Sequence, residues 1–378
     1  MKRAVILFFV SLCLWADEPA AKNVILFLGD AGGIATLHAA SIHAYGRPGQ
    51  LFVQHMPAIA LSDTSSASEW VSDSAAGMTA IVTGRKTNNG VLSQSDTAVR
   101  GKTDGVALKT ILEYAEERGL STGVVSNSPI ASATPAACYA HVNDRSKIGE
   151  IFAQVLKPRF GDGVDVILGP GRAEIANGIQ ALGLDVDVEL RKKGFRVDAT
   201  LQPVPPETRR LAVLLDADDL DLEAATNTAV DVLSRNPNGY FLMVESDLHT
   251  DKLVRGLERA AAFDQIIRNV ASRVSANTLV LFTADHSFDL RIAGKSPRTE
   301  PLISGAGAPS KSVVVLGHHS AEEVLVAAQG PGSSRVRGFL SNTDLFQIML
   351  AAYGWSPEQP PSSTPAPAIV LNRPCDHF

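Results

Sequence analysis

The chain has 378 residues, 45% of them hydrophobic and 20% charged, and its formal net charge is -6 at pH 7. This length and composition can bury a large core, which excludes a disordered chain. The charges are spread along the sequence without a block of Lys and Arg, so neither a nucleic-acid groove nor a polybasic membrane patch is expected.

The first residues have the pattern of a secretory signal peptide. Two basic residues, Lys2 and Arg3, precede an apolar run from Ala4 to Ala16, and the polar stretch Asp17 to Pro19 follows. The run is well short of the roughly 20 residues that a bilayer span needs, and no later stretch is long and apolar enough. We predict a signal peptide at residues 1–16 and an exported mature chain, periplasmic or extracellular, without a membrane span.

The cysteines leave alternatives open. Cys13 lies in the signal region, but Leu12 precedes it where a lipidation signal has a small residue, so a lipoprotein is the weaker interpretation. Cys138 and Cys375 remain in the mature chain. They could pair in an oxidising compartment or stay as free thiols.

Short apolar runs alternate with helical patterns along the chain. Largely apolar strands are typical of a buried parallel sheet, so we expect a three-layer α/β/α sandwich with a mostly parallel central sheet. Residues 357–367 indicate a surface linker before a short final strand. In chain order the predicted elements are a strand at 23–28, a helix at 107–118, a strand at 122–125, a helix at 148–156, strands at 164–168 and 211–215, a helix at 220–234, a strand at 240–244, a helix at 252–274, strands at 278–282 and 312–316, and a helix at 342–353.

Polar residues cluster where the predicted strands end. Asp30 follows the first strand, Glu245 follows the strand at 240–244, and Asp285 with His286 follows the strand at 278–282. Ligands of such sheets collect at the carboxyl ends of the strands. An adjacent carboxylate and imidazole suit zinc, although a lone Asp at a strand end is often only a cap.

A helix is predicted to begin near Ser74. Asp73 or Ser72 would cap it, and small residues from Ala75 onward continue it. A helix N-terminus offers free N–H groups and a positive dipole to an anion. Taken alone, Ser74 could equally be a capping residue without a chemical role.

Six separated blocks of the sequence resemble the alkaline phosphatase family. They occur in the family's order, span nearly the whole mature chain, and lie at residues 23–30, 71–90, 133–145, 243–245, 283–287 and 319–324. The resemblance implies one catalytic domain over residues 17–378. It further implies a metal-dependent enzyme that hydrolyses small-molecule phosphate monoesters, with two zinc ions and one magnesium ion as cofactors.

The resemblance also implies roles for individual residues. Ser74 would be the nucleophile that briefly carries the phosphate, and it would complete one zinc site. Arg145 would clamp two phosphate oxygens with its planar guanidinium, which Lys cannot reproduce. The residues implied to bind metal are Asp30, Ser74, Asp285 and His286 at the first zinc, His319 at the second zinc, and Asp30, Thr134 and Glu245 at the magnesium.

Two positions depart from the family pattern. The family has an Asp and a His five and nine residues after the equivalent of Glu245, where this chain has Thr250 and Val254. Asp247, His249 and Asp251 lie in the same loop, and we predict that some of them replace the missing ligands of the second zinc. The alternative is that they form only a solvated helix start. Ser132 stands near the third metal where the family has a side chain such as Asp or His.

Relatives with the same two-metal core catalyse other reactions, so the fold alone does not determine the substrate. A sulfatase would need Pro and Arg after its modified nucleophile, whereas Ala75 and Ala76 follow Ser74. Ser74 together with Arg145 favours monoesters over diesters, and a phosphodiesterase of the same superfamily is the second hypothesis. An inactive relative that binds metal or phosphate is the third. A homodimer is compatible with the sequence, which does not determine the oligomeric state.

Overall fold

A computed structural model of the chain describes residues 20–217, 220–294, 298–304 and 307–358. The predicted signal peptide, Cys13, Cys375 and most of the linker predicted at 357–367 lie outside these residues. No helix in the described ranges is long and apolar enough to cross a membrane.

The centre of the molecule is a ten-stranded sheet in the order β12-β2-β11-β8-β1-β7-β3-β4-β6-β5. All neighbouring pairs are parallel except those that β11 makes with β2 and β8. The strands are β1 (Asn23–Asp30), β2 (Ala58–Ser62), β3 (Ser121–Ser126), β4 (Val166–Pro170), β5 (Arg196–Asp198), β6 (Leu211–Leu215), β7 (Tyr240–Asp247), β8 (Thr278–Thr283), β11 (Val324–Gln329) and β12 (Gly338–Leu340).

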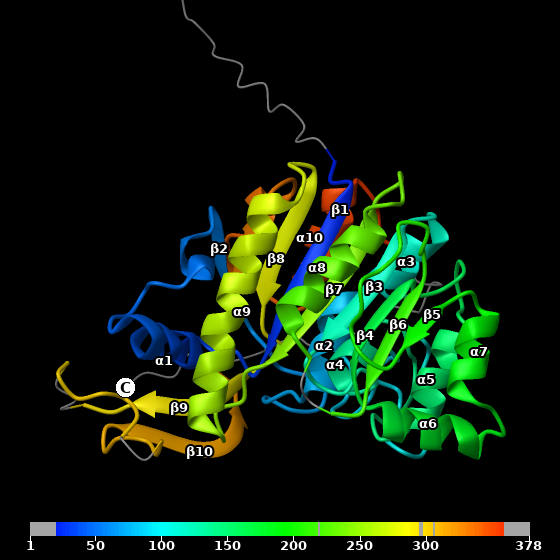
Figure 1. Cartoon of the computed structure of the whole chain (residues 1–378). Coiled ribbons are helices and arrows are strands. Elements are labelled where there is room, and N and C mark those ends of the chain that lie inside the picture. Colours follow the sequence, from blue (N-terminus) through cyan, green and yellow to red (C-terminus); the bar gives the residue numbers. More distant parts are fainter. Residues whose placement is uncertain (1–19, 218–219, 295–297, 305–306, 359–378) are drawn as a thin grey trace, which may run out of the picture.

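Helices cover both faces of this sheet (Figure 1). One face carries α2 (Ser74–Thr83), α3 (Ile111–Glu117), α4 (Ala133–Ala136), α5 (Ile148–Leu156), α6 (Arg172–Ala181), α7 (Val186–Lys192) and α10 (Asp344–Tyr353). The other face carries α1 (Ile34–Tyr45), α8 (Leu222–Leu233) and α9 (Leu253–Arg273). The predicted three-layer sandwich with a mostly parallel sheet is therefore confirmed.

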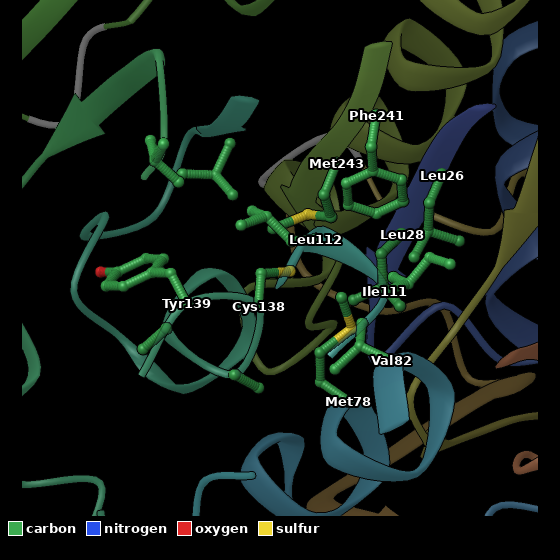
Figure 2. Packing of buried hydrophobic residues seen from close by; sticks show 14 of the residues in the cluster. Leu26, Leu28, Met78, Val82, Ile111, Leu112, Cys138, Tyr139, Phe241 and Met243 are labelled. Atoms are coloured by element: carbon green, nitrogen blue, oxygen red, sulfur yellow. The ribbon is translucent and has the colours of Figure 1, made fainter. Parts of the chain in front are cut away.

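The apolar side chains of β1 point alternately to the two faces of the central sheet, which shows why both faces must be covered. Its residues Leu26 and Leu28 belong to one buried cluster, and Ile25 and Phe27 belong to the other. All four are completely buried, because side chains of a strand point to opposite faces in turn. Figure 2 shows the first cluster, in which Met78 of α2 approaches the side chains from the sheet.

One predicted strand is placed differently. The run at 312–316 does not enter the central sheet, because it belongs to β10 (Val313–Ser320), which pairs antiparallel with β9 (Ser287–Ile292) in a separate two-stranded sheet. Val314 and Leu316 are exposed, so the run is not a buried parallel strand. A short apolar run has the same sequence pattern in a buried parallel strand as in a partly exposed antiparallel strand, and only its pairing partner distinguishes the two.

Candidate active site

The central strands of the sheet deliver three carboxylates to one edge. Asp30 is the last residue of β1, and Glu245 lies in β7, which pairs with β1 so that Leu28 faces Glu245. Asp285 follows the end of β8, the other neighbour of β1. All three carboxylates are buried, although carboxylates are rarely buried without a partner. Ligand atoms of Asp30, Asp285 and His286 all lie within 4.8 Å of one another.

Ser74 faces this cluster from the start of α2. The Asp73 side chain accepts a hydrogen bond of 3.0 Å from the Ala76 N–H, so Asp73 is the cap that the sequence allowed. Ser74 is the first helical residue and is buried. Its Oγ lies 3.3 Å from Nε2 of His286 and 3.5 Å from Oδ2 of Asp30. The helix N-terminus thus points a hydroxyl at the carboxylates and adds positive potential there.

Three histidines converge beside the carboxylates. His249, His286 and His319 have ligand atoms within 4.8 Å of one another, and the rings of His286 and His319 stack with centroids 3.7 Å apart. His319 comes from β10, so the separate two-stranded sheet contributes to the site. The neighbouring His318 is exposed.

Each of these histidines has its Nδ1 beside an acceptor. Nδ1 of His286 lies 3.1 Å from the Ser287 carbonyl, and Nδ1 of His319 lies 3.2 Å from the Ser72 carbonyl. Nδ1 of His249 lies 2.9 Å from Oδ1 of Asp247. When Nδ1 donates to such an acceptor, Nε2 is the nitrogen left to bind a metal.

The three residues predicted to replace the missing zinc ligands are placed differently from one another. His249 joins the histidine cluster. Asp247 contacts His249 through Oδ1, and its Oδ2 lies 2.7 Å from Nη1 of Arg259. Asp251 is exposed and lines the same cavity as His249. Asp247 therefore orients His249, and its two oxygens are already engaged in the structure.

Glu245, like Asp285, is completely buried. Ser126 donates a hydrogen bond to its carboxylate, and the Thr134 hydroxyl lies beside it. Burial, together with the negative charge of Asp30, raises the pKa of Glu245 to about 8. Thr134 and Ser132 also line the cavity that contains Asp30, and Ser132 is the residue before α4.

The charges and the unpaired atoms of the cluster fit divalent cations. Burial and the charge of Asp30 raise the pKa of Asp285 to about 6. Burial alone would also raise the pKa of Asp30, but the hydrogen bond with His286 and the charges of His249 and His286 lower it. Within the described residues, Oε1 of Glu245 and Oδ2 of Asp285 are buried without a hydrogen-bond partner. Oxygen and imidazole donors with free positions are the ligand set of zinc and magnesium sites.

Arg145 lines the cavity over the cluster. Its Nη1 lies 3.1 Å from Oδ2 of Asp73, next to the nucleophile, and its side chain is 31% exposed. The cavity has a volume of about 320 Å³, and its wall includes Asp30, Arg145 and His249. Arg145 and Asp30, both predicted as site residues, therefore line one cavity. Residues that line the cavity but were not predicted as site residues are Ser128, Pro129, Ser132, Lys252 and Arg255.

Comparisons with known proteins agree with this geometry. The family model described as Alkaline phosphatase matches residues 21–202 and 207–313, which is more than half of the chain. The streptomycin-6-phosphate phosphatase of Streptomyces griseus is 30% identical over 88% of this chain and 91% of its own length. The alkaline phosphatase of Escherichia coli strain K12 is 28% identical over 90% of this chain and 87% of its own length.

Solved structures give the same result. The alkaline phosphatase from the Antarctic bacterium TAB5 superposes with a TM-score of 0.75 at 28% identity, covering 89% of this chain and 100% of that chain. A variant of that enzyme, at 27% identity, has Mg bound in its M3 site. The fold and the site define a metal-dependent hydrolase with an α/β/α architecture. The chain belongs to the alkaline phosphatase family and is a phosphomonoesterase.

Proposed function

We propose that this enzyme works outside the cytoplasm and hydrolyses phosphate monoesters through a phosphoserine intermediate on Ser74, with two zinc ions and one magnesium ion. The observation that carries the proposal is the placement of the Ser74 hydroxyl. Its Oγ is buried at a helix N-terminus, 3.3 Å from His286 and 3.5 Å from Asp30. A serine that served only as a cap would not need these neighbours.

The donor set suggests which residues would hold each metal. Asp30, Asp285 and His286, with Ser74, would hold one zinc. His249 and His319 would hold the other. Asp251 is a candidate to complete the second set from the cavity wall, whereas Asp247 would act on His249. Asp30, Thr134 and Glu245 would hold the magnesium, with the free Oε1 of Glu245 as a ligand. When bound, such metals lower the pKa of a hydroxyl or water and stabilise charge on a leaving oxygen.

The remaining residues bind and orient the substrate. Arg145 would release Asp73 and hold two phosphate oxygens, because a guanidinium binds a phosphate through two parallel hydrogen bonds. Ser74 Oγ then attacks the phosphorus while the bond to the leaving alcohol breaks on the opposite side. Water displaces the serine from the phosphoserine in a second step and releases phosphate. The α2 N-terminus favours the negative charge throughout.

Two observations favour monoesters over diesters. Arg145 lines the cavity in a position to hold phosphate oxygens that carry no second ester group. The relative from Streptomyces griseus is named for the hydrolysis of a phosphate monoester. A phosphodiesterase of the same superfamily is the alternative, and a relative that only binds metal or phosphate is a second one.

The test compares three proteins on two substrates. We expect the metal-loaded protein to hydrolyse p-nitrophenyl phosphate, the reaction to stop in EDTA, and Ser74→Ala to lower kcat by about a thousandfold or more. Ser272→Ala, which removes an exposed serine hydroxyl near the C-terminal end of α9, is the control. Activity on bis-p-nitrophenyl phosphate alone would overturn the monoester assignment. Full zinc content without turnover of either substrate would identify a binding protein.

A further inference from the structure

A second cavity adjoins the active site. It has a volume of about 640 Å³ and lies between the start of α9 and β10. Asp251, Lys252 and Arg255 line both this cavity and the one that contains Asp30, so the two cavities meet at these residues. The outer cavity also has apolar walls, which include Val254 and Leu316.

The two cations at this junction, Lys252 and Arg255, have no partner among the residues that the structure describes. Neither side chain forms an ion pair or a hydrogen bond with them, and Arg255 is half-buried. The neighbouring arginines differ: Arg145 is paired with Asp73, and Arg259 is paired with Asp247. A half-buried guanidinium has lost part of its hydration, so it gains from an anionic partner.

Two acidic residues lie nearby and do not neutralise the junction. Asp251 lines both cavities, and Glu258 lines only the outer one. Both side chains are exposed, and neither forms an ion pair with Lys252 or Arg255. Two cations and one carboxylate leave the junction with a net positive charge. Arg255 is the more buried cation, and its planar fork matches a carboxylate or a phosphate.

The reaction geometry directs the leaving alcohol away from Ser74. In-line displacement puts the leaving oxygen opposite the attacking oxygen, so the alcohol points away from Ser74, which is not among the residues that line the inner cavity. The junction with the outer cavity provides the room for it. Substituents on the alcohol would therefore meet Lys252 and Arg255 before they reach Val254 and Leu316.

We propose that Arg255, assisted by Lys252, binds a negative charge on the leaving alcohol, so that the enzyme prefers phosphate monoesters whose alcohol carries a second anionic group. This inference rests on the proposed function and names the substrate class of the same site. In this proposal Arg255 and Lys252 determine substrate specificity, and Ser74 carries out the chemical step.

The test compares a ratio of two substrates between enzyme variants, so that the difference in intrinsic reactivity of the substrates cancels. We would compare kcat/KM for 3-carboxyphenyl phosphate with kcat/KM for phenyl phosphate in the metal-loaded enzyme. Arg255→Gln should lower the ratio of the two values about tenfold, because a charge-assisted hydrogen bond is lost. Lys252→Gln should lower it less. Raising the salt concentration should lower the ratio in the unaltered enzyme.

The control and the contrary outcomes separate this inference from the proposed function. Arg337→Gln removes an exposed arginine near the edge strand β12 and should leave the ratio unchanged. If the unaltered enzyme and both variants, Arg255→Gln and Arg337→Gln, hydrolyse phenyl phosphate and give the same ratio, the proposed subsite is overturned. The phosphatase function would then still stand. No turnover of either substrate by the metal-loaded enzyme would instead overturn the proposed function.

Discussion

Asp247 illustrates how a predicted ligand can serve a metal site indirectly. Both of its oxygens are engaged, one with His249 and one with Arg259. The hydrogen bond with His249 fixes which ring nitrogen carries the proton and which one faces His286 and His319. Residues that orient metal ligands in this way contribute to metal affinity without touching the metal.

Asp247→Asn should therefore weaken zinc binding without abolishing it. We expect the zinc affinity of the second site to fall by about tenfold to a hundredfold, because an amide holds the imidazole less firmly than a carboxylate. Competition with a chromophoric chelator measures this loss directly. Asp251→Asn in the same loop is the matched comparison. A larger loss there than in Asp247→Asn would identify Asp251 as a ligand of the second zinc, and an unchanged zinc affinity in Asp247→Asn would contradict the orienting role of Asp247.

Glu116 is a buried acid far from the metal cluster, and it predicts a pH dependence of stability. Its carboxylate accepts hydrogen bonds from Thr122 and from the Gly163 N–H. Burial and the nearby charge of Asp165 raise its pKa from 4.5 to about 8. The folded protein thus keeps this proton in a pH range where the unfolded chain has lost it. The group leaves stability unaffected below about pH 4.5, and it lowers the free energy of unfolding as pH rises toward 8.

Replacing Glu116 with Gln should make the free energy of unfolding less dependent on pH. Each unit of pKa difference corresponds to about 1.4 kcal/mol, so Glu116→Gln should lose less stability than the unaltered protein between pH 5 and pH 8. Urea unfolding at the two pH values measures the difference. Glu117→Gln is the adjacent control, because the ion pair with Lys109 lowers the pKa of Glu117 instead. Equal pH dependence in all three proteins would show that Glu116 ionises normally.

At the scale of elements, the packing of α2 against the end of β8 determines where the nucleophile lies. A Cβ added to Gly77 would come within 2.6 Å of the Asp285 carbonyl oxygen, which is a backbone atom. Either α2 or the Asp285 loop would then have to move. Ser74 is in the first turn of the same helix, so the displacement reaches the reacting hydroxyl.

Gly77→Ala should consequently impair both stability and activity. We expect a loss of roughly 1–3 kcal/mol in the free energy of unfolding from overpacking. Misplacement of the nucleophile should lower kcat by about tenfold to a hundredfold. Gly294→Ala is the control, because no described residue other than its chain neighbours has an atom within 4 Å of a Cβ at Gly294. Unchanged activity in Gly77→Ala would mean that α2 tolerates the shift.

The elements that the sequence predicts are those with strong local signals. The apolar runs at 23–28 and 240–244 are completely buried strands, and the amphipathic pattern at 252–274 becomes α9 (Leu253–Arg273). β11 and β12 were not predicted, because their places depend on pairing with β2, which is distant in sequence. The incorrect placement of 312–316 has the same origin, since pairing with β9 takes that run out of the central sheet.

The same distinction holds for the candidate site. Ser74, Asp30 and the pair Asp285 and His286 stand at ends of helices or strands, so local patterns indicate them, and the structure brings them together. The role of Asp247 depends on Arg259, one of many charged residues of α9, and no local pattern marks that contact. The junction of two cavities likewise depends on how β10 lies beside α9.

At the scale of the whole molecule, the site joins parts of the chain that are otherwise packed separately. β1, β7 and β8 belong to the central sheet, whereas His319 belongs to β10 in the two-stranded sheet. His319 also contacts the loop before α2 through the Ser72 carbonyl. A metal bound by His249 and His319 would therefore tie the two-stranded sheet to the central one.

Removal of the metals should thus loosen one region before the rest. A ligand that binds only the folded state stabilises it by mass action, so EDTA should lower the Tm of the whole protein. Amide hydrogen exchange should accelerate most in β9 and β10 and at the carboxyl end of β7, and least in α5 and α6, which lie at the opposite end of the molecule from β9 and β10 (Figure 1). His319→Ala should show fast exchange in β10 even with metal present, because the remaining ligands all come from outside that strand. Equal acceleration in every element would mean that metal binding stabilises the fold without holding the two-stranded sheet in place.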